Sequence, residues 1–171
     1  MKISGIVCEY NPFHNGHLHH INETKKNGAT HIVAVMSGNF VQRGDAAIMD
    51  KLDRAKLAVK SGADLVIEIP VPYCLSSAEI YAKGAVHLLG ALGAVDEISF
   101  GSECGNIEQL RETAEIIEKC AITCADDING LLKMGYTYPK ALNSIIMRKS
   151  IEAAEIISEP NNLLAIEYMR A

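Results

Sequence analysis

The sequence lacks any long hydrophobic segment, although 49% of its 171 residues are hydrophobic. Because a membrane-spanning helix needs a run of about 18 or more apolar residues, we expect no such helix and no membrane partner. The first residues, MKISGIVCEY, also lack the charged, apolar and small-residue order of a signal peptide. We therefore expect a cytoplasmic protein with one main domain and a sizeable buried core.

Cysteines are few and irregularly spaced. The 5 cysteines form no C-x-x-C pair, and their odd number favours reduced thiols over a disulfide framework or a zinc module. Cys120 and Cys124 lie four residues apart near the end of a predicted helix. We interpret them as small apolar packing residues rather than as a metal pair.

The chain also lacks an excess of positive charge. Its formal net charge is −5, which argues against general electrostatic attraction to nucleic acid, so any RNA contact must be local. One predicted helix carries four basic side chains, Lys51, Arg54, Lys56 and Lys60. Because Asp50 and Asp53 are interleaved with them, we interpret this surface as an ordinary solvated helix face.

Short apolar runs alternate with helical patterns along much of the chain. The runs at residues 3–8, 31–36 and 65–69 are typical of buried parallel strands, and a fourth strand is expected at 97–100. The main helical patterns cover residues 16–26, 50–61, 107–120 and 139–150, with others after Ser77 and Pro160. This order predicts a Rossmann-like parallel α/β sheet of four to five strands, with helices on both faces. We expect residues 1–105 to form a Rossmann-like nucleotide-binding core and residues 106–171 a mainly helical C-terminal extension.

One motif carries recognisable chemistry. Asn11-Pro12-Phe13-His14-Asn15-Gly16-His17 lies between the first strand and the first helix. At that point the backbone N–H groups of the first turn and the helix dipole favour an anion. Gly16 would let the backbone approach a phosphate, while His14 and His17 can donate hydrogen bonds to oxygens that gain charge as pyrophosphate leaves. The motif therefore predicts a phosphate-handling site.

Two other interpretations of these histidines are open. They are either plain surface groups near a loop or, with His20, members of a metal site at three-residue spacing. The metal interpretation is the weaker, because no nearby carboxylate or cysteine completes a ligand set, and we predict no metal site. Taken singly, His19 and His20 fit the exposed face of the helix, so the pattern alone gives them no role.

Longer strings extend the motif into a family resemblance. His14-x-Gly16-His17 resembles the signature of the nucleotidyltransferase and class I aminoacyl-tRNA synthetase superfamily. The strings at residues 9–17 (EYNPFHNGH), 36–44 (MSGNFVQRG), 100–103 (FGSE) and 160–162 (PNN) together resemble the bacterial tRNA(Met) cytidine acetate ligases. These strings are spread from one end of the chain to the other, so the resemblance is specific.

This resemblance implies a two-step ligase. ATP and acetate would give acetyl-adenylate and pyrophosphate, and the acetyl group would pass to the N4 amine of the wobble cytidine in elongator tRNA(Met). The expected partners are therefore ATP, acetate and tRNA(Met), with Mg²⁺ as the counterion of the triphosphate.

The resemblance also implies site residues. His14 and His17 would be catalytic. The main ATP-binding segment would be Val7, Cys8, Glu9, Tyr10, Asn11, Pro12, Phe13, His14, Asn15, Gly16, His17, Leu18, His19 and His20, joined by Gly101 and by Asn161 or Asn162. Ser37, Asn39 and Arg43, in the loop after the second strand, would contact acetate or the acceptor. Without the resemblance, Gly101 is equally a turn residue, and either asparagine is equally a cap of the last helix.

The C-terminal end departs from the family pattern. Family members carry a second, basic ATP-binding signature and further helical structure, expected to help hold tRNA, beyond the position equivalent to Ala171. The last helical pattern of this sequence stops without a cap, so we expect the natural protein to continue. Two other functions fit the same motif: an adenylyltransferase acting on a small phosphorylated metabolite, and an ATP-binding module without turnover.

Overall fold

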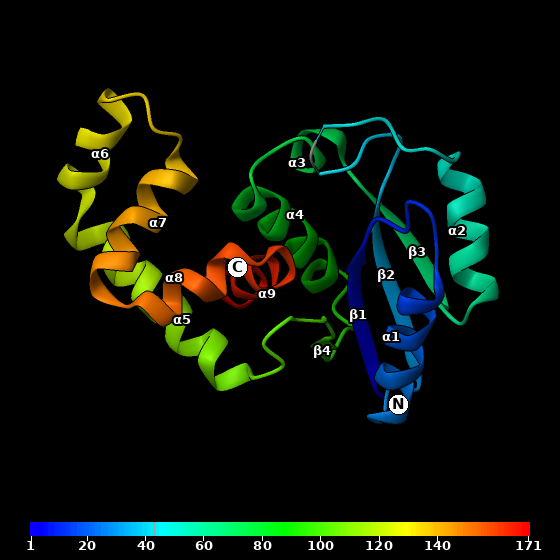
Figure 1. Cartoon of the computed structure of the whole chain (residues 1–171). Coiled ribbons are helices and arrows are strands. Elements are labelled where there is room, and N and C mark those ends of the chain that lie inside the picture. The colour runs from blue at the N-terminus through cyan, green and yellow to red at the C-terminus, as the bar shows by residue number, and fades with distance from the viewer. Residues whose placement is uncertain (43) are drawn as a thin grey trace. The chain divides into compact units, whose positions relative to one another are not determined.

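The computed structural model describes residues 1–42 and 44–171. Their contacts divide the chain into two compact units, Met1–Phe100 with Ala171 and Gly101–Arg170. The first unit contains a parallel sheet with helices around it, and the second is built from helices (Figure 1). Among the described residues, no helix is long and apolar enough to cross a membrane.

The sheet of the first unit has four parallel strands in the order β3-β2-β1-β4. The strands are β1 (Ile3–Cys8), β2 (His31–Ser37), β3 (Leu65–Ile69) and β4 (Glu97–Ile98). β1 lies in the interior of the sheet, with β2 and β4 on its two sides (Figure 1). The predicted bounds of β1 and β3 are confirmed, and β2 is one residue longer than predicted.

β4 is two residues shorter than predicted. The backbone nitrogen of Ser99 still donates to the carbonyl of Gly5 at 2.8 Å, as a continuing strand would. The Ser99 hydroxyl, however, is hydrogen-bonded to His20 and Thr24, both on the first helix. At Ser99, therefore, the backbone still bonds to β1 while the side chain contacts α1.

Helices cover both faces of the sheet, as predicted (Figure 1). The first unit contains α1 (Asn15–Lys26), α2 (Lys51–Lys60), the short α3 (Val71–Cys74) and α4 (Ala78–Ala91). α1 and α2 pack on one face, over a core of Ile6, Cys8, Tyr10, Ile21, Ile32, Ala34, Met36, Ala58 and Ala63. α4 packs on the other, and a Cβ added at Gly5 of β1 would lie 2.7 Å from a methyl carbon of Leu89. Glycine at this position therefore lets helix and sheet approach closely.

The second unit contains the helical extension that the sequence predicts. Its helices are α5 (Ile107–Thr123), α6 (Ala125–Lys133), α7 (Tyr138–Lys149), α8 (Ile151–Ser158) and α9 (Pro160–Arg170). Buried apolar side chains on every one of them supply its core, among them Leu110, Ile117, Ile128, Ile145, Ile146, Ile157 and Ile166. Cys120 and Cys124 are buried free thiols, which confirms that they are packing residues.

Candidate functional site

His14 and His17 form the N-terminal cap of α1. His14 is the N-cap residue, and its Nδ1 accepts a hydrogen bond from the backbone nitrogen of Gly16 at 3.1 Å. Nδ1 of His17 accepts one from the backbone nitrogen of His14 at 3.2 Å. The two rings stack, with centroids 3.7 Å apart and an interplanar angle of 24°. This is a capping box in which imidazoles replace the usual Ser or Thr and Glu or Gln.

The cap fixes where each ring carries its proton. A backbone N–H can only donate, so each Nδ1 must accept with its lone pair and cannot itself carry a hydrogen. When the ring is neutral, its hydrogen is therefore on Nε2. Burial, with smaller contributions from His14 and His20, lowers the pKa of His17 to about 4. His17 is therefore neutral at physiological pH, and its Nε2–H is available as a donor.

Gly16 is required by the cap itself. A Cβ added to Gly16 would lie 2.9 Å from Cε1 of His14, closer than real Cβ contacts. A side chain at this position would push the His14 ring out of the stack. The sequence suggests that glycine serves close approach of a phosphate, and the structure adds this second reason.

Tyr10 anchors the motif to the core. Its side chain is 1% exposed, and its ring centroid lies 4.9 Å from that of Phe13 and 4.8 Å from that of His17, both in edge-on contacts. The backbone of Tyr10 has φ of 48°, and the Asn11–Pro12 peptide bond that follows is cis. Asn11 Oδ1 accepts a hydrogen bond from the backbone nitrogen of Ile48 at 2.8 Å. Aromatic packing and this bond hold His17 in one place.

His20 is half-buried and hydrogen-bonded, so it is not the fully exposed helix residue that the pattern predicts. Nε2 of His20 lies 3.0 Å from the Ser99 hydroxyl, which lies 2.7 Å from the Thr24 hydroxyl. Because Thr24 donates its hydrogen to the His20 carbonyl, Ser99 donates to Thr24 and His20 donates to Ser99. Burial and the neighbouring His19 lower the pKa of His20. His20 thus ties α1 to the end of β4.

The arrangement of the three histidines also bears on the metal interpretation. The His14 and His17 Nδ1 atoms face backbone N–H groups, and His20 is bonded to Ser99. Across residues 1–42 and 44–171, no three His, Cys, Asp or Glu side chains gather in a way that could hold a metal ion.

The other members of the predicted ATP-binding segment lie on β1 and α1. Val7 and Cys8 belong to β1, and the Cys8 thiol donates to the carbonyl of Val35 at 3.7 Å. Burial raises the pKa of the Cys8 thiol, so this cysteine is a packing group. The exposed residues of the segment are Pro12, His14, Asn15, Gly16, Leu18 and His19.

Arg54 is buried. The interpretation from the charge pattern, which placed it on a solvated helix face, is wrong for this residue. Its side chain is 0% exposed. Nε donates to the carbonyl of Met49 at 3.2 Å, one terminal nitrogen donates to the carbonyl of Glu9 at 2.5 Å, and the other donates to the carbonyl of Gly38. Glu9 and Gly38 directly follow β1 and β2, so one guanidinium joins the carboxyl ends of both strands. The sequence feature that indicates the burial of Arg54 is its spacing of four residues from Ala58, which places both on the same face of α2.

Of the predicted substrate residues, Ser37 ends β2 and Asn39 lies in the loop that follows. Ser37 is fully buried, and its hydroxyl has no hydrogen-bond partner among the described residues. Asn39 is exposed, and its carbonyl accepts from the backbone nitrogen of Ala47 at 2.9 Å. Arg43 lies outside the described residues. The Glu9 carboxylate accepts from the backbone nitrogen of Gln42 at 2.6 Å, which fastens this loop beside the end of β1.

In the second unit, the asparagines predicted to contact the nucleotide lie around Glu103. The Glu103 carboxylate accepts from the backbone and side-chain nitrogens of Asn161, at 3.1 and 2.8 Å, and from the backbone nitrogen of Asn162 at 2.7 Å. Burial alone would raise the pKa of Glu103, but these hydrogen bonds lower it. Asn162 Oδ1 accepts from the backbone nitrogen of Cys104 at 3.1 Å. Two strings about 58 residues apart are thus brought together.

Gly101 lies two residues before this carboxylate and is exposed. A Cβ added there would have no atom within 4 Å, and its φ is outside the left-handed range that favours glycine. The fold of the unit therefore gives no reason for glycine at this position.

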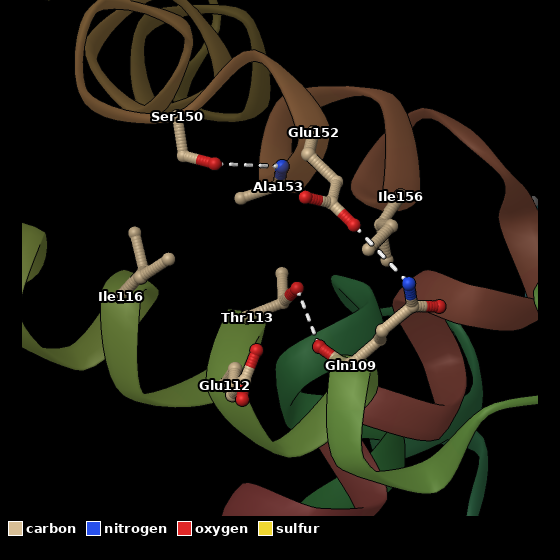
Figure 2. Close-up of a pocket in the computed structure, with 8 residues that line it drawn as sticks. All are labelled: Gln109, Glu112, Thr113, Ile116, Ser150, Glu152, Ala153 and Ile156. Atoms are coloured by element: carbon tan, nitrogen blue, oxygen red, sulfur yellow. Dashed lines mark hydrogen bonds between the residues drawn. The ribbon is translucent and has the colours of Figure 1, made fainter.

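A pocket in the second unit lies between α5 and α8, and none of the residues predicted for the site lines it (Figure 2). Its lining residues are Gln109, Glu112, Thr113, Ile116, Ser150, Glu152, Ala153 and Ile156. Gln109 donates to Glu152 at 3.1 Å, Thr113 donates to the Gln109 carbonyl at 2.7 Å, and Ser150 accepts from the Ala153 nitrogen at 3.1 Å. Only the Gln109–Glu152 bond joins the two helices, while the other two lie within α5 and at the start of α8, and we assign the pocket to helix packing.

The fold and the histidine pair define a class of protein. A sheet in the order β3-β2-β1-β4 has its topological switch between β1 and β4, and the pair lies where the connection from β1 enters α1. Open α/β sheets of this order bind nucleotides at that switch, so this is a Rossmann-like α/β domain with a histidine pair near the usual nucleotide position. The family described as HIGH Nucleotidyl Transferase matches residues 1–171, and the chain belongs to this family.

Among the similar proteins are the tRNA(Met) cytidine acetate ligases of several bacteria. The chain is 46% identical to the tRNA(Met) cytidine acetate ligase of Acetivibrio thermocellus, covering 100% of this chain and 42% of that protein. It is 48% identical to the ligase of the same name from Thermoanaerobacter sp. strain X514, covering 100% and 43%. The resemblance inferred from the sequence is confirmed. The chain spans less than half the length of the curated relatives it matches.

Solved structures agree with the fold. A crystal structure of Thermotoga maritima TmcAL bound with alpha-thio ATP matches with a TM-score of 0.89 and 39% identity, over 99% of this chain and 42% of that chain. The apo form of the same protein matches with a TM-score of 0.90 at the same identity and coverage.

Proposed function

We propose that this chain carries the ATP-dependent acetate activation of a ligase that forms N4-acetylcytidine at the wobble cytidine of elongator tRNA(Met). The names of its relatives support this proposal, as does the ATP analogue bound by TmcAL. The observation that carries it is the stacked pair of His14 and His17, whose Nε2–H donors lie at the N-terminus of α1.

The first step forms acetyl-adenylate. A carboxylate oxygen of acetate attacks the α-phosphorus of ATP, and the bond from that phosphorus to the leaving pyrophosphate breaks. Negative charge grows on the pyrophosphate oxygens as this bond breaks. The two Nε2–H groups and the first-turn amides of α1 stabilise that charge without themselves losing a proton. His17 is already neutral, and its ring is held by the hydrogen bond that Nδ1 accepts from the His14 backbone. Little reorganisation is therefore needed at the moment of reaction.

The second step consumes the adenylate. The N4 amine of the cytidine attacks the acetyl carbon, the bond from that carbon to the phosphate oxygen breaks, and AMP leaves while the amine loses a proton. No phosphorus–nitrogen bond forms, so the nucleotide is a leaving group rather than part of the product. This separates the ligase from an adenylyltransferase, whose product keeps the nucleotide.

For the remaining contacts we propose the sets implied by the resemblance. Residues 7–20, Gly101 and Asn161 or Asn162 would contact ATP, and Ser37, Asn39 and Arg43 would contact acetate or the acceptor. Mg²⁺, when present, would neutralise charge on the triphosphate. It would be held mainly by phosphate oxygens and water, since the described residues offer no carboxylate cluster for it.

The decisive experiment is acetate-dependent exchange of labelled pyrophosphate into ATP, on this chain and on the full natural protein where that is longer. His17→Gln is the informative variant, because glutamine can keep the capping acceptor while the imidazole is lost. We expect exchange to fall about 100-fold or more in His17→Gln. His87→Ala, an exposed change on α4, is the matched control and should leave exchange unaltered. ATP binding without exchange in the full protein would refute acetate activation.

A further inference from the structure

The turn between α6 and α7 exposes an unbroken stretch of side chains. We call residues 133–140 the α6–α7 connection, and every one of them is exposed. Gly135 has φ of 90°, and its nitrogen donates to the carbonyl of Leu132 at 3.0 Å. The nitrogen of Tyr136 donates to the carbonyl of Leu131 at 3.1 Å. This is a Schellman motif, so the connection is an ordered turn that gives its side chains defined positions.

Two tyrosines and a methionine supply large apolar surface on this turn. Tyr136 is 44% exposed and Tyr138 is 46% exposed, and they are separated by one residue. Met134 is 74% exposed. Aromatic rings that remain accessible on an ordered turn can stack on a planar partner at little cost in conformational entropy.

Two lysines flank the tyrosines. Lys133 ends α6, and Lys140 lies in the first turn of α7, which carries no acidic residue. Neither lysine is in an ion pair with any described residue. The acidic residues of α6, Asp126 and Asp127, lie in its first turn at the opposite end of the helix. The connection is therefore locally basic although the whole chain carries a net charge of −5.

We propose that the α6–α7 connection contacts unpaired nucleotides of the tRNA, with Tyr136 and Tyr138 stacking on bases and Lys133 and Lys140 facing phosphates. The identity of the RNA rests on the proposed function. Base faces are accessible in single-stranded loops but not in an A-form duplex, and stacking tolerates any base. A protein partner would also bury the tyrosines, but two unpaired lysines around them fit a polyanion better.

The test is the dissociation constant for a labelled, unmodified tRNA(Met) transcript, measured by fluorescence anisotropy. The double variant Tyr136→Ala and Tyr138→Ala should bind about tenfold more weakly or worse, whereas the double Tyr→Phe variant keeps both rings and should bind like the unchanged protein. Lys133→Ala with Lys140→Ala should reduce the salt dependence by about 0.7 in log–log slope per lysine. A blunt RNA duplex of similar length should bind more weakly than the transcript.

Matched controls lie elsewhere in the same unit. Ile151→Ala removes an exposed apolar side chain and Lys119→Ala an exposed lysine, and both should leave RNA binding unchanged.

Equal binding by the double alanine variant, or no binding by the unchanged protein, overturns the proposal. The proposal is also overturned if the double alanine variant has a lower melting temperature and loses pyrophosphate exchange. The tyrosines would then be packing residues that stabilise the protein itself. Exchange that is absent in all forms, with RNA binding still dependent on the tyrosines, would refute acetate activation and leave this surface in place.

Discussion

Nδ1 of His17 lies 3.2 Å from the backbone nitrogen of His14 and accepts its hydrogen, while Nδ1 of His14 accepts from Gly16 at 3.1 Å. One nitrogen of each ring thus stabilises the start of α1, and the other is left as a donor. An alanine at either position removes the helix cap and the donor together. Variants that keep the cap are therefore needed to separate folding from chemistry.

Acid should weaken the fold through His17. Its pKa is about 4 in the folded chain, against about 6.5 when unfolded, so the unfolded chain binds more protons between these values. The contribution of His17 to stability is fully present above about pH 6.5 and is lost as the pH falls to about 4. Urea unfolding midpoints measured across this range should fall with pH. His17→Gln should flatten part of that fall, and an unchanged slope would contradict the assignment.

Gly16→Ala should destabilise the protein, although alanine normally favours a helix. Glycine to alanine at an unstrained helical position stabilises by up to about 1 kcal/mol. Here the added methyl would lie 2.9 Å from the His14 ring and displace it from the stack. We expect a free energy of unfolding lower by about 1 kcal/mol and weaker ATP binding. Gly90→Ala in α4, where a Cβ meets nothing within 4 Å, is the matched control and should not destabilise. A more stable Gly16→Ala variant would show that the ring moves without penalty.

The features that were predicted correctly from the sequence are those that depend on local patterns. The bounds of β1 and β3 follow from short apolar runs, and the histidine motif is recognisable because its residues contact one another within one turn. The end of β4 was misplaced by two residues, and local patterns also could not reveal that Ser99 contacts His20, 79 residues away. The burial of Arg54 was missed for the same reason, since its acceptor on Glu9 lies 45 residues away. A neighbouring aspartate in the sequence suggested solvent, whereas the true partners are carbonyls from other elements.

Arg54 should be critical for the shape of the site. Arg54→Met keeps much of the volume but leaves the carbonyls of Glu9, Gly38 and Met49 without their donor. Each unsatisfied buried group costs about 1–3 kcal/mol, so we expect the free energy of unfolding to fall by about 3 kcal/mol or more. Arg54→Lys should recover only part, because one ammonium cannot reproduce the planar set of donors. Lys60→Met on the exposed side of α2 is the control, expected within about 0.5 kcal/mol of the unchanged protein. Urea unfolding measures all three.

Gly101→Ala should weaken nucleotide binding without altering the fold. A Cβ at Gly101 meets no atom within 4 Å and its backbone φ is not left-handed, so the melting temperature should be unchanged. If the nucleotide approaches this backbone, as the family resemblance implies, the methyl should raise the dissociation constant for ATP by about tenfold, or ~1.4 kcal/mol. Gly105 is the contrasting position, because its φ of 61° makes alanine strained there. Gly105→Ala should therefore lower stability. Calorimetric titration with ATP, with thermal unfolding of both variants, separates the two effects. Equal ATP affinity in Gly101→Ala and the unchanged chain would remove Gly101 from the nucleotide site.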